Sequence, residues 1–187
     1  MLVRQGADLV VNISASPFLV GKHLERARLL KEKAVKNGVP MFYVNLVGGQ
    51  DELVFDGQSM AVDKMGNLIA LGRQFEEDLV LTDIDLEKGT ALKVVAPVHD
   101  NVQEMFGALV LGIKDYFMKT GFERAVVGLS GGIDSSVTVC IAVEALGKEN
   151  VIGISMPSKF SSGHSKSDAE RLAENLGICF VRVGIQE

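Results

Sequence analysis

The chain has 187 residues, of which 47% are hydrophobic and 23% charged, a composition typical of globular proteins rather than of disordered segments. Its formal net charge of −5 supplies no basic field for nucleic acid, and no apolar run approaches the roughly 20 residues that a membrane-spanning helix needs. We therefore predict a cytoplasmic protein with no nucleic-acid partner and no membrane partner. The two cysteines, Cys140 and Cys179, form no ligand pattern and are predicted to be reduced core residues.

The first part of the chain is predicted to form a β-α-β unit. Residues 7–14 indicate a buried strand, because five of the eight are apolar. Residues 22–36 carry apolar side chains at helical spacing, including Leu24 and Leu30, and stop before an Asn-Gly pair, which predicts an amphipathic helix. Residues 41–47 are mostly aromatic or aliphatic and predict a second strand.

Beyond this unit the pattern changes to short β segments. Residues 52–55, 59–62, 68–71 and 79–84 are short, mainly apolar segments, and turn signals such as Asp56–Gly57 separate them. This succession of short apolar segments and turns predicts consecutive β-hairpins.

Two stretches of this region resemble a known family. They are residues 12–18, NISASPF, and residues 43–57, YVNLVGGQDELVFDG. Together they resemble the last third of a nitrilase-type amidase domain, a four-layer αββα fold with a Cys-Glu-Lys catalytic triad. In that family the triad lies upstream of the stretch with which this chain begins, and no cysteine precedes Cys140. The resemblance therefore implies that the chain holds no catalytic residue of the amidase.

The same resemblance implies two substrate contacts. Ser16 and Lys22 fall where the family places glutamine-binding residues, after the Ser-Pro turn and at the start of the following helix. From the residues alone, Ser16 would begin a turn and Lys22 would be a solvated charge at a helix end, and both interpretations stay open at this point.

A connecting segment and a long helix follow. Residues 86–98 show no clear period, whereas residues 99–120 place apolar side chains at three- and four-residue steps and predict a helix. We expect the end of the amidase domain at residues 1–90, a linker at residues 91–103 and a second domain at residues 104–187.

The second domain is organised around one loop. The apolar run 124–129 ends in a Ser-Gly-Gly turn, and the apolar-periodic segment 137–146 follows, which predicts a strand, a tight loop and a helix. Adjacent glycines allow close backbone approach, and a helix start offers unpaired N–H groups, so this loop is suited to holding a phosphate. Asp134 would repel a bare phosphate, which argues for a divalent cation between them, with Mg²⁺ as the oxygen-preferring choice. The predicted ATP-binding residues of this loop are Gly128, Leu129, Ser130, Gly131, Gly132, Ile133, Asp134, Ser135 and Ser136.

The loop sequence SGGIDSS also carries a resemblance. It lacks the lysine and the spacing of the Walker phosphate loop. After an apolar strand it resembles the pyrophosphate loop of the N-type ATP pyrophosphatases, which adenylate a carboxyl or carbonyl oxygen. The alternative is a Gly-Gly turn whose Asp and Ser residues merely cap a helix.

The rest of the chain repeats the β-loop-α pattern. A helix at residues 136–146 is followed by a strand at 151–156, a helix at 166–175 and a strand at 178–183, which predicts a parallel sheet with right-handed crossovers. Ligands of such sheets lie at the carboxyl ends of the strands. Met156 and Ser158 should therefore face the same crevice as the glycine-rich loop and border the adenine of ATP.

Taken together, the two halves resemble the glutamine-dependent NAD⁺ synthetase family. The fold that this implies is α/β: the end of a nitrilase-like αββα sandwich, followed by the start of a parallel-sheet, Rossmann-like ATP pyrophosphatase domain of the adenine nucleotide alpha hydrolase type. The family uses Mg-ATP to adenylate deamido-NAD⁺, releases pyrophosphate, and amidates the adenylate with ammonia from glutamine, giving NAD⁺ and AMP. We expect a fragment of such a ligase, which would be a homo-oligomer.

Two alternatives remain. Another N-type ATP pyrophosphatase amidotransferase would share residues 130–136 but not the string at residues 47–57. An inert interaction module would keep both folds without binding ligands. Titration with Mg-ATP distinguishes the inert module from an enzyme.

Overall fold

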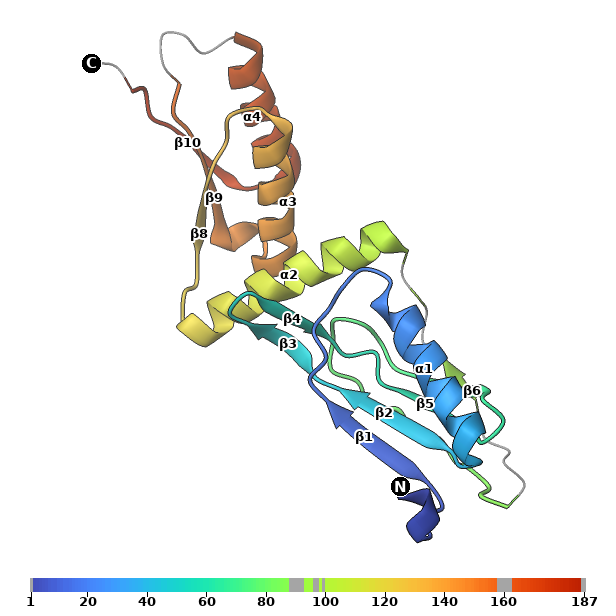
Figure 1. Ribbon diagram of the computed structural model, residues 1–187. Helices are drawn as coiled ribbons and strands as arrows, with labels where there is room; N and C mark the ends of the chain where they lie inside the picture. Colours follow the sequence, from blue (N-terminus) through green and yellow to red (C-terminus); the bar gives the residue numbers. More distant parts are fainter. Residues whose placement is uncertain (1, 88–92, 96–97, 99, 158–162, 186–187) are drawn as a thin grey trace. The chain divides into compact units, whose positions relative to one another are not determined.

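The computed structural model describes residues 2–87, 93–95, 98, 100–157 and 163–185, and its elements are shown in Figure 1. The chain divides into two compact units, Met1–Ala108 and Leu109–Glu187. None of the described helices is both long enough and apolar enough to cross a bilayer.

The first unit is built on a mixed sheet of five strands. Their order in the sheet is β1 (Val10–Ser14), β2 (Met41–Asn45), β5 (Met60–Val62), β6 (Leu68–Leu71) and β7 (Val94–Val95). The pairs β1–β2 and β6–β7 are parallel, whereas β2–β5 and β5–β6 are antiparallel. A separate antiparallel hairpin consists of β3 (Val47–Gln50) and β4 (Leu53–Asp56), and a 3₁₀ turn at Val3–Gln5 precedes β1.

Helix α1 (Lys22–Asn37) packs on this sheet and confirms the helix predicted at residues 22–36. It ends at Gly38, whose left-handed backbone (φ +67°) lets its N–H return to the carbonyl of Ala34. The buried stripe differs from the predicted one, because Leu24 is 67% exposed and Arg26 is buried in line with Leu30. The core under the helix contains Leu30, Ala34, Met41, Tyr43, Met60, Val62 and Leu71.

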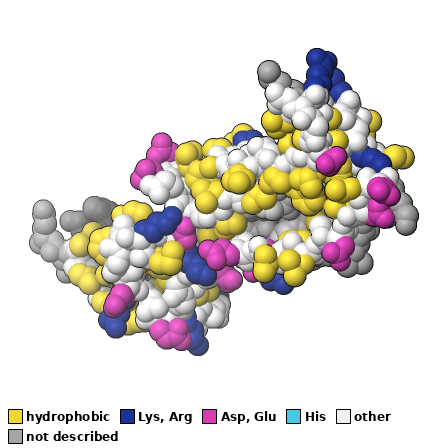
Figure 2. Space-filling model, turned by 90° about the horizontal axis from the view of Figure 1, so that it is seen from below, with side chains coloured by type: hydrophobic (Ala, Val, Ile, Leu, Met, Phe, Trp, Pro, Cys, Tyr) yellow, Lys and Arg dark blue, Asp and Glu magenta, His cyan; other side chains and the backbone are white. Residues whose placement is uncertain are grey.

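Strand β1 contradicts the prediction of a buried strand at residues 7–14. It is the edge strand of the sheet, and Val11 and Ile13 are 53% and 83% exposed. An apolar run predicts that a strand can be buried, but burial needs a covering layer on each face, and the described residues leave the face that carries Val11 and Ile13 uncovered. Figure 2 shows hydrophobic side chains gathered in a band on one face of the chain.

Two further strand predictions needed correction. The strand predicted at residues 41–47 is interrupted at Leu46, because the chain leaves the sheet there and Val47 begins the β3–β4 hairpin. Residues 79–84 form no named strand. Val80 and Ile84 pack against the side of the sheet opposite α1, whereas Leu79 is 82% exposed, so this alternation reflects an irregular segment covering the sheet rather than a strand within it.

The other short strands follow the sequence closely. The segments predicted at residues 52–55, 59–62 and 68–71 correspond to β4, β5 and β6. Within the segment predicted as a connection, Val94–Val95 forms β7 and pairs with β6. Long-range pairing of two residues leaves no periodic signal, which is why the sequence did not indicate it.

Helix α2 (Asn101–Thr120) confirms the long helix, and His99 lies outside the described residues. Asp100 caps its start, since Oδ1 of Asp100 accepts hydrogen bonds from the backbone N–H groups of Val102 and Gln103 at 2.9 and 2.8 Å. The side chain of Gln103 accepts in return from the N–H of Asp100, which completes a reciprocal cap.

The second unit contains a parallel sheet of three strands, as predicted. The sheet order is β10 (Cys179–Arg182), β9 (Val151–Ser155) and β8 (Ala125–Gly128), and both pairs are parallel. Helices α3 (Ile133–Leu146) and α4 (Gly163–Leu176) lie on one side of this sheet in Figure 1, and a 3₁₀ turn at Lys148–Asn150 precedes β9.

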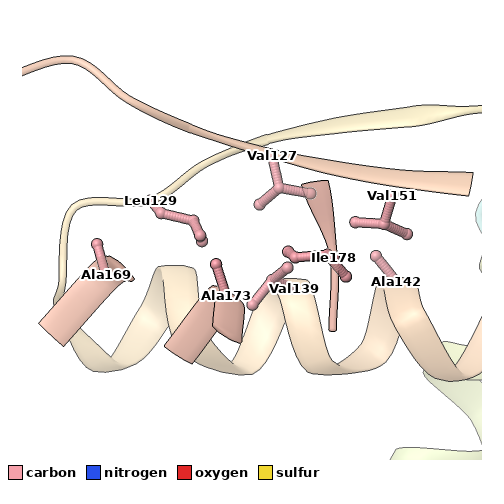
Figure 3. Close-up of a cluster of buried hydrophobic side chains, with 8 residues drawn as sticks. All are labelled: Val127, Leu129, Val139, Ala142, Val151, Ala169, Ala173 and Ile178. Carbon is pink, nitrogen blue, oxygen red and sulfur yellow. The ribbon is translucent and has the colours of Figure 1, made fainter. Parts of the chain in front are cut away.

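The core of this unit lies between the sheet and the two helices, and Figure 3 shows its side chains pointing toward one another. Its buried members are Val127, Leu129, Val139, Ala142, Val151, Ala169, Ala173 and Ile178. Both cysteines are free, but Cys179 is exposed and Cys140 only half-buried, so neither is the buried core residue that was predicted. Cys179 begins the edge strand β10, where apolar neighbours in sequence do not guarantee cover.

Candidate functional site

The glycine-rich loop joins the end of β8 to the start of α3. Leu129 anchors it, because this side chain is 3% exposed and its N–H donates to the carbonyl of Ile154 at 2.8 Å. Gly131 follows with φ +81°, a backbone conformation that favours glycine. Gly132 is the N-cap of α3. The sequence thus places its two glycines where the chain reverses from strand to helix.

Serine hydroxyls hold the shape of this loop. The hydroxyl of Ser135 accepts from the N–H of Ser130 at 3.3 Å, lies 3.1 Å from the hydroxyl of Ser130, and donates to the carbonyl of Gly132 at 3.0 Å. Ser136 donates to the same carbonyl at 2.9 Å. The structure thus links Ser130 of the loop to Ser135 and Ser136 at the start of α3, and their role in binding ATP stays a prediction.

The start of α3 offers an anion-binding surface. Its N-cap, Gly132, provides no capping side chain, and the first intrahelical acceptor serves the N–H of Ser136. The first-turn N–H groups of a helix have no intrahelical acceptor, and they lie at the positive end of the helix dipole. Ile133 and Asp134 belong to this turn and are exposed. Such a terminus can bind a phosphate, and a carboxylate beside it can hold a cation.

Met156 lies at the same edge of the sheet. It follows β9, is 54% exposed, and its Cε is 3.9 Å from the place where a Cβ on Gly128 would lie. The two residues end adjacent parallel strands, as the sequence predicted. Ser158 lies outside the described residues. Among the residues that are described, no cluster of three or more His, Cys, Asp or Glu side chains has the arrangement of a metal site.

A second group of candidate residues lies in the first unit. Ser16 and Lys22 both line a cavity of about 550 Å³ between α1 and the β1–β2 edge. The N–H of Ser16 donates to Oδ1 of Asn45 at 2.9 Å, and the Nζ of Lys22 donates to the carbonyl of Pro17 at 2.9 Å. The structure therefore brings together the two residues that the resemblance singled out.

A buried ion pair fixes the turn that carries Ser16. Nη1 of Arg26 lies 2.8 and 2.7 Å from the two carboxylate oxygens of Asp56, whereas Nη2 donates to the carbonyl of Ser16 at 2.9 Å and to its hydroxyl at 3.2 Å. Asn45 adds longer contacts of 3.4 Å to Asp56 and to the carbonyl of Ser16. The guanidinium also lies 5.9 Å from the ring centre of Tyr43. These contacts tie the turn at Ser16 to α1 and to the end of β4.

Sequence reasoning missed three members of this region. The sequence placed Asp56 in a turn, and it pointed to no role for Arg26 or Glu104. The four-residue spacing of Arg26 from Leu30 was the available signal, because it places the arginine on the buried stripe. No local pattern could have identified the partners, since Arg26 and Asp56 are 30 residues apart.

Comparison with known proteins supports both halves of this description. Residues 1–94 match the carbon-nitrogen hydrolase family model, and residues 105–187 match the NAD synthase model. The glutamine-dependent NAD(+) synthetase of Synechocystis is 52% identical over 179 residues, which cover 95% of this chain and 32% of that protein. That of Thermotoga maritima is 44% identical over 207 residues, covering 93% of this chain and 36% of its own.

Solved structures of glutamine-dependent NAD+ synthetases also match this chain. The glutamine-dependent NAD+ synthetase of Acinetobacter baumannii, solved in complex with ADP, matches with a TM-score of 0.95 and 36% identity over 99% of this chain and 35% of that one. The enzyme of Cytophaga hutchinsonii matches with a TM-score of 0.80 at 21% identity, a likeness of fold alone.

The chain spans about a third of the length of the curated relatives it matches. The family resemblances seen in the sequence are confirmed, as is the α/β fold. The chain belongs to the carbon-nitrogen hydrolase family through residues 1–94, and it continues, in the order found in the glutamine-dependent NAD(+) synthetases, into an NAD synthase segment at residues 105–187.

Proposed function

We propose that this chain forms part of a ligase that makes NAD⁺ from deamido-NAD⁺, with ATP as the activating substrate and glutamine as the nitrogen source. Its own contribution is the ATP-binding loop at Gly128–Ser136 and part of a glutamine site at Ser16 and Lys22. The observation that carries the proposal is the N-terminus of α3, which follows a Ser-Gly-Gly loop and has no capping side chain. It lies within the residues that match the NAD synthase model. The relative from Acinetobacter baumannii was solved with ADP, which agrees with an adenine nucleotide here.

The residues at the loop suit the ligand. The backbone N–H groups of the first turn of α3 would bind the phosphates, and Ser130 and Ser135 keep the loop in shape. Asp134 is an exposed oxygen donor in that turn, and with phosphate oxygens it would hold Mg²⁺. The cation would stabilise the charge on the departing pyrophosphate. Met156, at the edge of the same sheet, would border the adenine, and Ser158 is proposed for the same role from the sequence.

The wider assignments rest on the family resemblance. They are domain limits at residues 1–90 and 104–187, a homo-oligomeric whole protein, and a cytoplasmic location. The adenylation of deamido-NAD⁺ and the supply of ammonia from glutamine belong to the whole enzyme, whose amidase triad lies outside the residues matched by this chain.

Replacing Asp134 with alanine tests the nucleotide site. We expect the 187-residue chain to bind ATP in the presence of Mg²⁺, and Asp134→Ala to weaken this binding on the order of tenfold, since the cation loses a ligand. In EDTA the substitution should not weaken ATP binding, because it removes a repulsive carboxylate. Isothermal titration with and without Mg²⁺ measures both effects.

Cys140→Ala is the matched control, because it lies on the same helix but outside the first turn. It should bind Mg-ATP as the unsubstituted chain does. Equal losses in the two variants, or no binding of Mg-ATP by the unsubstituted chain, would contradict the assignment and favour an inert module.

A further inference from the structure

Glu104 is a buried carboxylate that is not part of the proposed ATP site. It lies in the first turn of α2, yet its exposure is only 1%. Its Oε2 accepts a hydrogen bond from the N–H of Gly21 at 2.8 Å, 83 residues away in sequence. Its Oε1 accepts from the Nε2 of Gln74 at 2.8 Å and lies 2.7 Å from the Nδ1 of His23. Both carboxylate oxygens are thus engaged.

The contacts of Glu104 converge on the start of helix α1. Gly21 is the N-cap of that helix, with φ +73° and no capping side chain, and Lys22 and His23 are its first two residues. A negative charge at a helix N-terminus is favourable, whereas the positive charge of Lys22 in the same place is not. The carboxylate of Glu104 therefore brings a negative charge from another element to this helix start, where it accepts a hydrogen bond from the N–H of the N-cap residue itself.

The close packing of α2 against Phe75 keeps the carboxylate of Glu104 in place. One turn after Glu104, Gly107 lies so close to the ring of Phe75 that a Cβ there would be 2.6 Å from Cδ2 of the ring. That ring packs edge-on against Phe18, with 5.4 Å between ring centres. Any larger residue at position 107 would push the helix outward and withdraw the carboxylate from Gly21.

The residue held between these contacts is Lys22. Gly21 and His23, its two neighbours, both contact Glu104, and the Nζ of Lys22 reaches the carbonyl of Pro17. Arg26 donates to the same carbonyl at 3.1 Å and also holds Ser16. A buried carboxylate is costly unless its oxygens are hydrogen-bonded, and here the partners that offset this cost are residues on both sides of Lys22, together with Gln74.

We propose that Glu104 is a positioning residue for glutamine, which sets Lys22 and, through Pro17, the turn at Ser16 in their binding geometry. The inference rests on the proposed function, in which Ser16 and Lys22 contact glutamine. Glu104 itself does not touch the ligand. It acts through three contacts: its oxygens accept hydrogen bonds from the backbone N–H of Gly21 and the side chain of Gln74, and it lies beside the ring of His23.

The test is titration of the 187-residue chain with L-glutamine, followed by NMR. Glu104→Gln keeps the size of the side chain but leaves one oxygen where two accepted, so either the N–H of Gly21 or the side chains of Gln74 and His23 must face an NH₂ group. We expect the affinity for glutamine to fall on the order of tenfold, the range that follows from losing a hydrogen bond to a charged group. Hydrogen exchange at the amide of Gly21 should quicken in the same variant.

Two controls separate positioning from general loss of stability. Ile69→Ala opens a void in the core on the opposite side of the sheet and should leave glutamine affinity unchanged. Glu123→Gln removes an exposed carboxylate and should also be without effect. If Glu104→Gln does not fold, Glu104→Asp keeps the charge but is one methylene shorter, and it should still weaken glutamine binding.

The outcomes are distinct. Unchanged affinity in the folded Glu104 variant, or an equal loss in Ile69→Ala, overturns the positioning role while leaving Ser16 and Lys22 as a glutamine site. Absence of glutamine binding by the unsubstituted chain overturns the glutamine site, and the positioning role with it. Weaker binding confined to the Glu104 variants supports both.

Discussion

Replacing Asp56 with alanine is expected to destabilise the first unit by about 3–5 kcal/mol, the cost of leaving one charge of a buried ion pair without its partner. Asp56 is 1% exposed and Arg26 only 8%. Without the carboxylate, the guanidinium keeps its hydrogen bonds to Ser16 but loses both short contacts to a counter-charge. The turn that carries Ser16 should loosen as well.

The measurement is hydrogen exchange of the amides in β5 and β6, which reports the stability of the first unit separately from the second. Glu32→Ala provides the control, because Glu32 pairs with Arg28 in an ion pair whose side chains are 58% and 59% exposed. That variant should change stability by only about 0.3–0.5 kcal/mol. Similar losses from the two substitutions would show that the buried pair is no stronger than a surface one.

Leu129→Ala is expected to destabilise the second unit by about 2–5 kcal/mol, the usual range for emptying a leucine site in a core. This side chain is 3% exposed and lies among the residues between the sheet and its two helices. Its loss should also free the loop that begins at Ser130. Amide exchange in β9 and α3 measures the change, and Val126→Ala, 61% exposed in the preceding strand β8, should have little effect.

A double substitution sharpens this test. A Cβ on Gly153 would lie 2.7 Å from Cδ1 of Leu129, so Gly153→Ala alone should be unfavourable. In the Leu129→Ala background that methyl group enters the vacated space, and the combined loss should be smaller than the sum by about 0.5–3 kcal/mol. Strict additivity would mean that the two residues do not share this contact.

Local patterns in the sequence were enough for the elements that position the nucleotide loop. Residues 124–146 contain an apolar run, a Ser-Gly-Gly turn and a helical period in succession, and each of these depends only on near neighbours. The parallel sheet followed from the alternation of strands and helices, because a parallel crossover needs a helix between its strands. The structure confirms β8, α3, β9, α4 and β10 in this arrangement.

The first unit was harder to predict from the sequence, because its important contacts join segments that are far apart in the chain. Neither the Arg26–Asp56 pair nor the reach of Glu104 to Gly21 produces a periodic pattern. The strand at residues 79–84 was wrongly predicted because a short apolar segment can equally be an irregular stretch that covers the sheet on one side. Burial of β1 was wrongly predicted because apolar side chains only make burial of a strand favourable. Whether another segment covers the strand depends on the rest of the fold.

The open edge of β1 affects how the chain can be handled in solution. Its outer backbone N–H and C=O groups face no strand in the described sheet, and Ile13 and Val11 beside them are exposed. Such an edge is a template on which a second molecule can add a strand. The net charge of −5 opposes that encounter at low ionic strength, and added salt screens it. Concentrated, high-salt samples should therefore become turbid first, and dilute, low-salt samples should remain clear for longest.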